Sequence, residues 1–211
     1  MAEKSRPARG AAAALAVAVA LACPGCDREP TFEAVDLGRL VSMPDEAPAG
    51  VVYSPKLSGS VDLDGVGSDA AERSELARDG FRASYEAVLA SPDLLDFLVL
   101  SKPGERAPAH TTLVTSSATL FSDADGAATA LPVLRRAAMS GLAGAARPLP
   151  SDEFGDGAFA FEGSTLEGHD VVAYGWRVGN LCQVVRSEGR VDPSDILFMA
   201  RNMRRRAQDA T

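Results

Sequence analysis

Residues that carry most enzyme chemistry are scarce in this sequence of 211 amino acids. It contains two histidines, His110 and His169, and a single cysteine after residue 26, Cys182. No G-x-S-x-G, H-E-x-x-H, P-loop or G-x-G-x-x-G pattern is present. These absences argue against the common serine hydrolase, zinc protease and nucleotide-binding sites, and we expect no cofactor. One cysteine in the folded part also excludes a disulfide scaffold, so packing must hold the core together.

The sequence is also short of positive charge. It has 21 Lys and Arg residues against 29 Asp and Glu residues, which gives a formal net charge of −8. An acidic surface repels the phosphate backbone of DNA and RNA. We therefore expect no nucleic acid among the partners of this protein.

A stretch long enough to span a bilayer is missing as well, although an apolar run occurs near the N-terminus. The run covers residues 11–22, follows the basic residues Lys4, Arg6 and Arg9, and has no charged side chain. About a dozen residues at 1.5 Å rise extend about 18 Å, which is well short of the hydrocarbon core of a membrane. The basic start and the short apolar run are typical of a secretory signal peptide.

The run ends in Ala20-Leu21-Ala22-Cys23, which resembles the lipobox of bacterial lipoproteins. The resemblance implies that residues 1–22 are removed and that Cys23 is acylated, which would anchor the chain to the outside of a bacterial cell membrane. Cys26 is the alternative acylation site, because Gly25 precedes it. The two cysteines also form a C-x-x-C pair, which elsewhere indicates a redox or metal site. Its position at the expected processing point favours lipidation here.

After the anchor, residues 23–49 contain several prolines among acidic and small residues, a composition that predicts a flexible tether. Residues 50–208 are predicted to form one domain, which suits the usual domain size. Within it, Asp62, Asp64 and Asp69 are spaced through glycines and are similar to calcium-binding loops. Val66 and Arg73 stand where such a loop needs oxygen ligands. A polar loop that leads into a helix is therefore the favoured interpretation, with these aspartates a weak candidate metal site.

Periodicity predicts the main elements of the domain. Alternating or β-branched residues indicate strands at 81–87, 110–121 and 158–161, and apolar residues at helical spacing indicate helices at 93–100, 124–142 and from 193 onward. Pro132 lies inside the second of these helices and lacks a backbone N–H, so we expect a kink or break near Ala130.

The clearest local signal is a β-hairpin over 169–187 with Gly179-Asn180 at its turn, where glycine at the first central position suits a type II′ turn. A two-residue turn places Val178, Trp176 and Tyr174 on one face, opposite Leu181, Gln183 and Val185, and this face is predicted to be core. Arg177 and Cys182 fall on the other face. Cys182 is expected to be a small buried side chain, with a reactive thiol as the alternative.

These elements predict an α+β fold with a single antiparallel sheet of about five strands and two main helices packed on one face. The order of elements loosely resembles that of small PsbP-like secreted lipoprotein domains. This resemblance concerns shape alone and implies no activity.

The function that the sequence favours is binding without catalysis, as a lipid-anchored sensor or accessory domain whose partner is an envelope protein or a small ligand. Tyr174, Trp176 and Arg177 are the candidate contact residues, provided that an open groove exposes them. The first alternative is a small envelope hydrolase that uses His110 or His169. The second is a calcium-dependent adhesion module built on the three aspartates.

Overall fold

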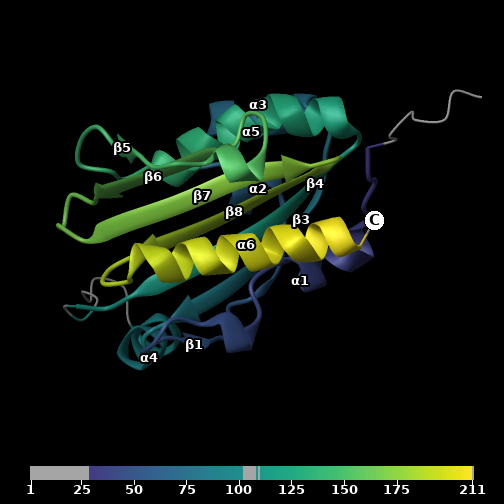
Figure 1. Ribbon diagram of the computed structural model, residues 1–211. Coiled ribbons are helices and arrows are strands. Elements are labelled where there is room, and N and C mark those ends of the chain that lie inside the picture. Colours follow the sequence, from purple (N-terminus) through teal and green to yellow (C-terminus); the bar gives the residue numbers. More distant parts are fainter. Residues whose placement is uncertain (1–28, 102–107, 109, 211) are drawn as a thin grey trace, which may run out of the picture.

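The computed structural model describes residues 29–101, 108 and 110–210. Its centre is one antiparallel sheet of eight strands in the order β1-β3-β4-β8-β7-β6-β5, with β2 also paired to β3 (Figure 1). The strands are β1 Val52–Tyr53, β2 Gly59–Val61, β3 Phe81–Ala90, β4 Leu113–Phe121, β5 Arg147–Pro148, β6 Phe159–Ser164, β7 Asp170–Val178 and β8 Leu181–Glu188. The single antiparallel sheet and the α+β class are as expected. The strand count is higher than the expected five because β1, β2 and β5 are two or three residues long, too short to show alternation.

Six α-helices accompany the sheet in the described part of the chain: α1 Leu37–Leu40, α2 Leu63–Val66, α3 Ala70–Arg78, α4 Pro92–Leu100, α5 Ala124–Met139 and α6 Pro193–Asp209. Short 3-10 turns cover Ala34–Asp36, Pro44–Glu46 and Asp152–Phe154. No helix among the described residues has both the length and the apolar character needed to cross a bilayer.

The two long helices lie on opposite faces of the sheet, not on one face as expected (Figure 1). Successive strand residues point to opposite faces, and the neighbours Cys182 and Gln183 show the consequence. The Cys182 thiol donates to the Ala127 carbonyl of α5 at 3.2 Å, whereas Gln183 Nε2 is 3.4 Å from the Met203 carbonyl of α6. An amphipathic helix needs an apolar face to pack on, but its sequence does not say which one. We refer to the two sides as the α5 face and the α6 face.

The α6 face is closed. Trp176 and Tyr174 pack there with Ile196, Met199 and Met203 of α6, and all five are buried. The predicted hairpin pairing is confirmed, since Trp176 lies opposite Gln183 and Tyr174 opposite Val185. Gly179 has a φ of 56°, as a type II′ turn requires.

The start of the domain differs from the expected boundary at residue 50. Phe32, Leu37 and Leu40 are buried against the α6 side of β3, β4 and β8, so residues 32–49 belong to the fold and not to a tether. The Phe32 N–H donates to Asn180 Oδ1 at 2.8 Å, and Gln183 Nε2 donates to the Leu40 carbonyl at 2.6 Å. The prolines of this segment indicated a linker. The contacts that hold it to the sheet are made with residues far away in the chain, and such contacts leave no local pattern in the sequence.

Helix α5 continues through Pro132 without the expected break. A proline removes the hydrogen bond to the carbonyl four residues earlier, here that of Ala128. Both Pro132 and Ala128 are exposed, so water can satisfy this carbonyl. Burial of Leu131 and Leu134 on the opposite side of the helix holds it to the sheet.

Candidate functional site

The three aspartates of the candidate calcium loop do not converge. Asp62 caps α2 by accepting from the Gly65 N–H at 3.1 Å, and Asp69 caps α3 by accepting from the Glu72 N–H at 2.9 Å. Asp64 forms an ion pair with Arg73 at 3.4 Å. Across the residues that the structure describes, no group of three or more His, Cys, Asp or Glu side chains could hold a metal ion. The carboxylates in this loop therefore serve local structure.

The expected contact residues of the hairpin are not on an open surface. Trp176 is completely buried, and its indole N–H donates to Gln183 Oε1 at 2.9 Å. Tyr174 is buried beside Phe154, with ring centroids 5.6 Å apart. Arg177 forms an ion pair with Glu29 at 2.8 Å. The aromatic residues of this hairpin serve the core, so the expectation that they contact a ligand is wrong for both.

The two histidines line one shallow hollow of about 350 Å³. It lies at the end of the sheet that holds the first residues of β4 and β7. His169 Nδ1 lies 3.4 Å from Glu188 Oε1. In the described part of the chain, no serine side chain is within hydrogen-bonding distance of His110 or His169. The pair therefore does not assemble the nucleophile and base that a serine hydrolase needs.

The cysteines fall into two groups. Cys23 and Cys26, the candidate lipidation sites, lie outside the described residues. Cys182 is a free thiol with no exposed surface, packed under α5, and burial raises its pKa well above the ordinary range. A thiol that stays protonated is a poor nucleophile, and Cys182 therefore behaves as the small core residue that the sequence predicts.

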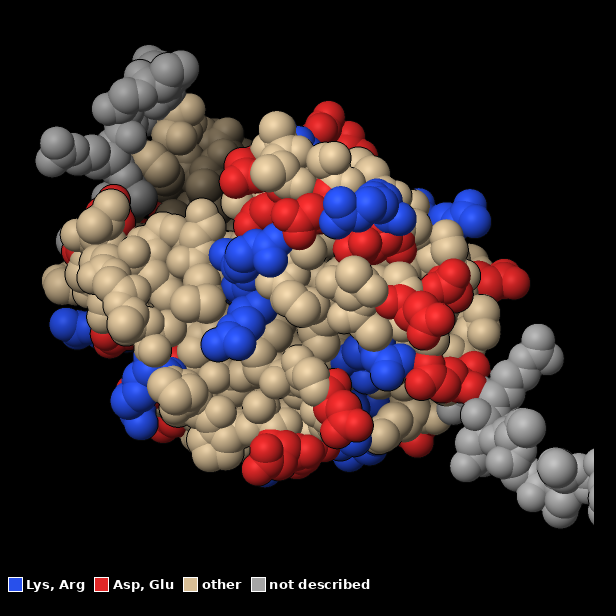
Figure 2. Space-filling model, turned by 90° about the horizontal axis from the view of Figure 1, so that it is seen from above, with Lys and Arg blue, Asp and Glu red and all other residues tan. Residues whose placement is uncertain are grey.

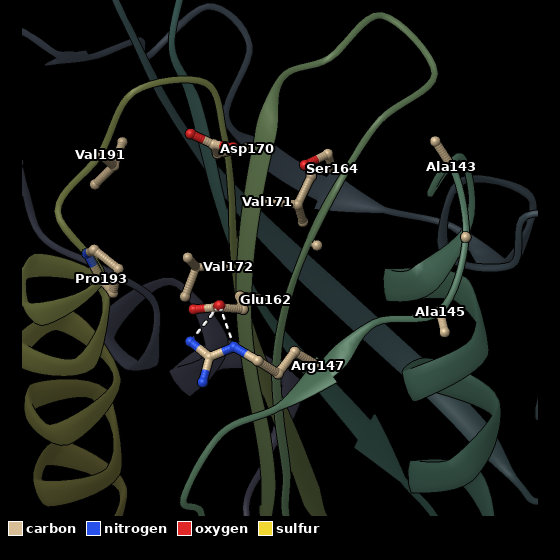
Figure 3. Close-up of a pocket in the computed structure, with 12 residues that line it drawn as sticks. Ala143, Ala145, Arg147, Glu162, Ser164, Asp170, Val171, Val172, Val191 and Pro193 are labelled. Atoms are coloured by element: carbon tan, nitrogen blue, oxygen red, sulfur yellow. Dashed lines mark hydrogen bonds and ion pairs between the residues drawn. The ribbon is translucent and has the colours of Figure 1, made fainter.

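A large hollow of about 550 Å³ lies beside β5, β6 and the start of α6 (Figure 3). Two of its charged residues, Arg147 and Glu162, pair with each other across the strands, as the dashed lines in Figure 3 show. The Arg147 side chain is 67% exposed. The pair is solvated and mutually satisfied, and the third charged residue of this hollow, Asp170, is exposed, so none of the three is held in a buried setting.

A smaller cavity on the α5 face has different chemistry. It measures about 150 Å³ and lies between the sheet, α2 and α5. We call it the polar groove and define it by its floor and its walls. The floor residues are Ser84 and Glu86 of β3, Thr115 and Ser117 of β4, and Val184 and Arg186 of β8; the walls are Val61, Gly65, Val66, Leu134, Ala137 and Ala138.

Strand register assembles this floor from three strands. Glu86 lies opposite Ser117, which in turn lies opposite Val184 on the next strand. Thr115 occupies the adjacent row and lies opposite Arg186. Paired residues of antiparallel strands share a face, so alternate polar residues of β3 and β4 necessarily meet beside α5. Helix α5 covers β7 and β8 more closely than β3 and β4, and the groove lies where this cover ends.

Glu86 is the unusual group in the polar groove. It is half-buried, and the loss of hydration on burial raises the pKa of its carboxyl above the ordinary value. No described residue forms an ion pair or hydrogen bond with it. A partly buried carboxyl without a partner costs stability, and such groups are more frequent at functional sites than elsewhere.

Some of the other polar groups in the groove already have hydrogen-bonding partners. The Ser84 hydroxyl is 3.0 Å from the Thr119 hydroxyl, and Arg186 Nε donates to the Ala138 carbonyl at 3.1 Å. Arg186 Nη1 also donates to Glu188 at 3.0 Å. The hydroxyls of Thr115 and Ser117 form no hydrogen bond with any described residue. With respect to the described residues, the groove therefore offers one unpaired carboxyl and two hydroxyls without a hydrogen-bonding partner.

Sequence reasoning missed this site. In the strand predicted at 81–87, Arg82, Ser84 and Glu86 alternate with apolar residues, a pattern that indicates the solvent side of a half-buried strand. The signal that could have found it is the matching polar set of Thr115, Ser117 and Thr119 at alternate positions of β4. Two neighbouring strands with polar residues on the same face indicate a sheet surface that no helix fully covers.

Charged side chains on the outer surface of α3 and α5 give no second candidate. Acidic and basic residues lie close together across this side of the molecule (Figure 2). Arg136 of α5 and Glu75 of α3, for example, form an ion pair at 2.6 Å. Exposed pairs of this kind contribute little to stability and create no strong field of one sign.

Comparison with solved structures gives a likeness in fold. No protein-family model matches the chain, and no curated protein matches its sequence. Among solved structures, the chain is similar to the extracellular domain of PknH from Mycobacterium tuberculosis, with a TM-score of 0.52 and 12% sequence identity. The likeness covers 86% of this chain and 99% of that domain. At this identity it establishes a shared fold for nearly the whole described domain.

Proposed function

We propose that this chain is a lipid-anchored domain on the outside of a bacterial cell membrane, and that it works by binding a small ligand in the polar groove without catalysing a reaction. The observation that carries the binding proposal is Glu86, whose half-buried carboxyl has no partner among the described residues. A ligand that satisfies this group would recover the free energy that its burial costs.

The location rests on two observations of different kinds. The first is the basic start, short apolar run and Cys23 of the N-terminal segment. The second is the fold shared with a domain that is extracellular in PknH. If Cys23 carries the lipid, the buried Phe32 lies nine positions after it (32 − 23), a span of at most about 30 Å. The tether would therefore be short, and the domain would stay close to the membrane.

Absence of catalysis is supported by the arrangement of the candidate nucleophiles and bases. Cys182 is buried and protonated, and His169 has Glu188 as its neighbour in place of a serine. The polar groove holds no histidine or cysteine among its lining residues. A binding role uses the groove as it stands, whereas an enzyme would need groups that the described residues do not place there.

Two experiments test the two parts separately. For the anchor, the full chain is expressed in a bacterium grown with labelled palmitate. We expect label on the parent and on Cys26→Ser, and none on Cys23→Ser. A double Cys23→Ser, Cys26→Ser variant that remains labelled, or a parent that takes up no label, would overturn the anchor.

For the groove, backbone amide NMR spectra of the full-length chain are recorded with a set of small alcohols, carboxylates and amines. We expect ligand-induced shifts to gather on β3, β4, β8 and α5. Shifts gathered instead around Arg147 and Glu162, or no saturable shifts at all, would contradict binding in the polar groove.

A further inference from the structure

The polar groove has an unbalanced charge that points to the kind of ligand it takes. Of the described residues that line it, Glu86 and Arg186 are the only charged ones. Arg186 is already paired with Glu188 at 3.0 Å and bonded to the Ala138 carbonyl. Glu86 has no basic partner among the described residues. The ionised groove therefore carries one uncompensated negative charge.

Charged groups on the elements around Glu86 do not compensate its negative charge. The lining residues of β2, β4 and α5 are uncharged. On α2, Asp64 faces outward and pairs with Arg73 of α3. On β8, Glu188 is shared between Arg186 and His169. An anionic ligand would have to displace Glu188 from Arg186, whereas a cationic ligand would find Glu86 unoccupied.

Hydrogen-bonding capacity of the floor agrees with a cationic head group. The carboxylate of Glu86 only accepts hydrogen bonds, and the hydroxyls of Ser117 and Thr115 can accept as well as donate. An ammonium group has three donors and no acceptor. Ser117 lies directly opposite Glu86 in the strand pairing, so a carboxylate and a hydroxyl are presented side by side.

The walls of the groove limit the rest of the ligand. They are aliphatic, formed by Val61 and Val66 on one side and by Leu134, Ala137 and Ala138 of α5 on the other. A volume of about 150 Å³ corresponds to roughly five water molecules at about 30 Å³ each. This space suits a short aliphatic chain and not a large polar body such as a nucleotide.

We propose that the polar groove binds a small aliphatic primary amine, with the ammonium group on Glu86 and Ser117 and the hydrocarbon chain between α2 and α5. This inference rests on the proposed binding function and narrows it to one chemical class. A neutral alcohol of the same length would lack the charge that Glu86 calls for, and a carboxylate of the same length would be repelled.

The test compares three probes that share a four-carbon chain: n-butylammonium, n-butanol and butyrate. Binding to the full-length chain is measured by calorimetry and mapped by amide NMR. We expect n-butylammonium to bind in the groove at least about tenfold more tightly than the other two, because a charge-assisted hydrogen bond is about twice as strong as a neutral one. Its affinity should fall as the pH is lowered through the raised pKa of Glu86, since the proton and the ammonium compete for the carboxylate.

Three variants make the test specific. Glu86→Gln should lose n-butylammonium affinity by about tenfold or more and lose the pH dependence. Glu33→Gln changes the net charge equally at an exposed position outside the groove and should bind as the parent does. Ala137→Leu fills the groove without altering its charge and should also abolish binding.

Outcomes separate this inference from the proposed function. If n-butanol or butyrate binds in the groove as tightly as n-butylammonium or more tightly, the proposed preference for an amine is wrong, but the proposed binding function still holds. If none of the three probes shifts the amide signals of β3, β4, β8 or α5, both the amine preference and the proposed binding function are wrong. If Glu86→Gln binds n-butylammonium as the parent does, the amine preference is also wrong, because the Glu86 charge on which that preference depends would have no effect.

Discussion

The two faces of the sheet use polar residues in different ways. On the α6 face, Gln183 is completely buried and bonds both the Trp176 indole and the Leu40 carbonyl. On the α5 face, Glu86 and Ser117 lie opposite each other on neighbouring strands, and their side chains have no hydrogen-bonding partner in the described part of the chain. A satisfied buried polar group helps to fix a unique packing, whereas partly buried carboxyls with a raised pKa are more frequent at functional sites. The same strands therefore build a closed side and a side that holds the polar groove.

The difference arises from how completely each helix covers the sheet. On the α6 side, α1 and residues 32–43 pack beside α6 and close the surface over β3, β4 and β8. On the α5 side, α2 and α3 reach the Phe81 end of β3 and leave the middle of β3 and β4 to the groove. Variants on the two faces should therefore affect different properties, stability on one and binding on the other.

The largest expected effect is on the closed face. Trp176→Ala removes a fully buried aromatic ring that packs against Phe154 with centroids 5.0 Å apart. We expect a loss of about 3–5 kcal/mol in the free energy of unfolding and a fall in Tm of about 10 °C or more. Thermal and urea unfolding measure both. A change of less than about 1 kcal/mol would mean that the α6 face is not the stable side.

Gln183→Ala should have a smaller but still large effect, because it leaves the Trp176 indole N–H and the Leu40 carbonyl without this partner. Each unsatisfied buried group costs roughly 1–3 kcal/mol. Ser117→Ala on the open face is the matched control, since its hydroxyl has no partner among the described residues to lose. Similar destabilisation by both substitutions, measured by urea unfolding, would erase the distinction between the faces.

Glu86→Gln should raise stability at neutral pH. The raised pKa of Glu86 means that the folded state holds the proton more tightly than the unfolded chain does. The ionised carboxyl therefore destabilises the fold at a pH above its folded pKa, and this cost vanishes at a pH below the ordinary value, where both states are protonated. We expect a Tm increase of about 2–4 °C at neutral pH, on the order of 1 kcal/mol, and none in acid.

This comparison needs Glu33→Gln as its control. Glu33 is exposed, so the loss of its charge should leave Tm unchanged at either pH. If Glu86→Gln instead lowered Tm at neutral pH, its carboxylate would be making a stabilising contact and would not be available to a ligand.

Ser117→Ala should have the smallest effect on stability, within about 0.5 kcal/mol, as for most sites that lack special contacts. It should nevertheless weaken n-butylammonium binding several-fold, because one acceptor beside Glu86 is lost. Calorimetry of the variant measures the second effect and urea unfolding the first. An unchanged affinity would remove Ser117 from the site and keep only Glu86.

Local features of the fold were predictable from the sequence, and long-range ones were not. The Gly179-Asn180 turn fixed the register of β7 and β8, and the helical spacing of apolar residues indicated α4, α5 and α6. The position of residues 32–49 on the sheet depends on bonds to Asn180 and Gln183, more than 130 residues away. No local pattern encodes such contacts.

The site was harder to predict for the same reason. Glu86 has the sequence context of an ordinary outward-facing strand residue, between Tyr85 and Ala87. Its burial comes from α2 and α5, elements that lie about 20 and 50 residues away in the chain. The aromatic side chains of Trp176 and Tyr174 indicate contact residues only if they are exposed, and the centre of a sheet buries large aromatic side chains more often than it exposes them.

The most direct test of the binding site is a carbon-13 NMR titration of the Glu86 carboxyl in the full-length chain. In the free protein its pKa should lie above the ordinary value for glutamate, and added n-butylammonium should lower it, because a bound ammonium stabilises the carboxylate. A pKa at or below the ordinary value in the free protein would show that Glu86 is already solvated or paired. The contrast between the closed α6 face and the polar groove on the α5 face would then have no support.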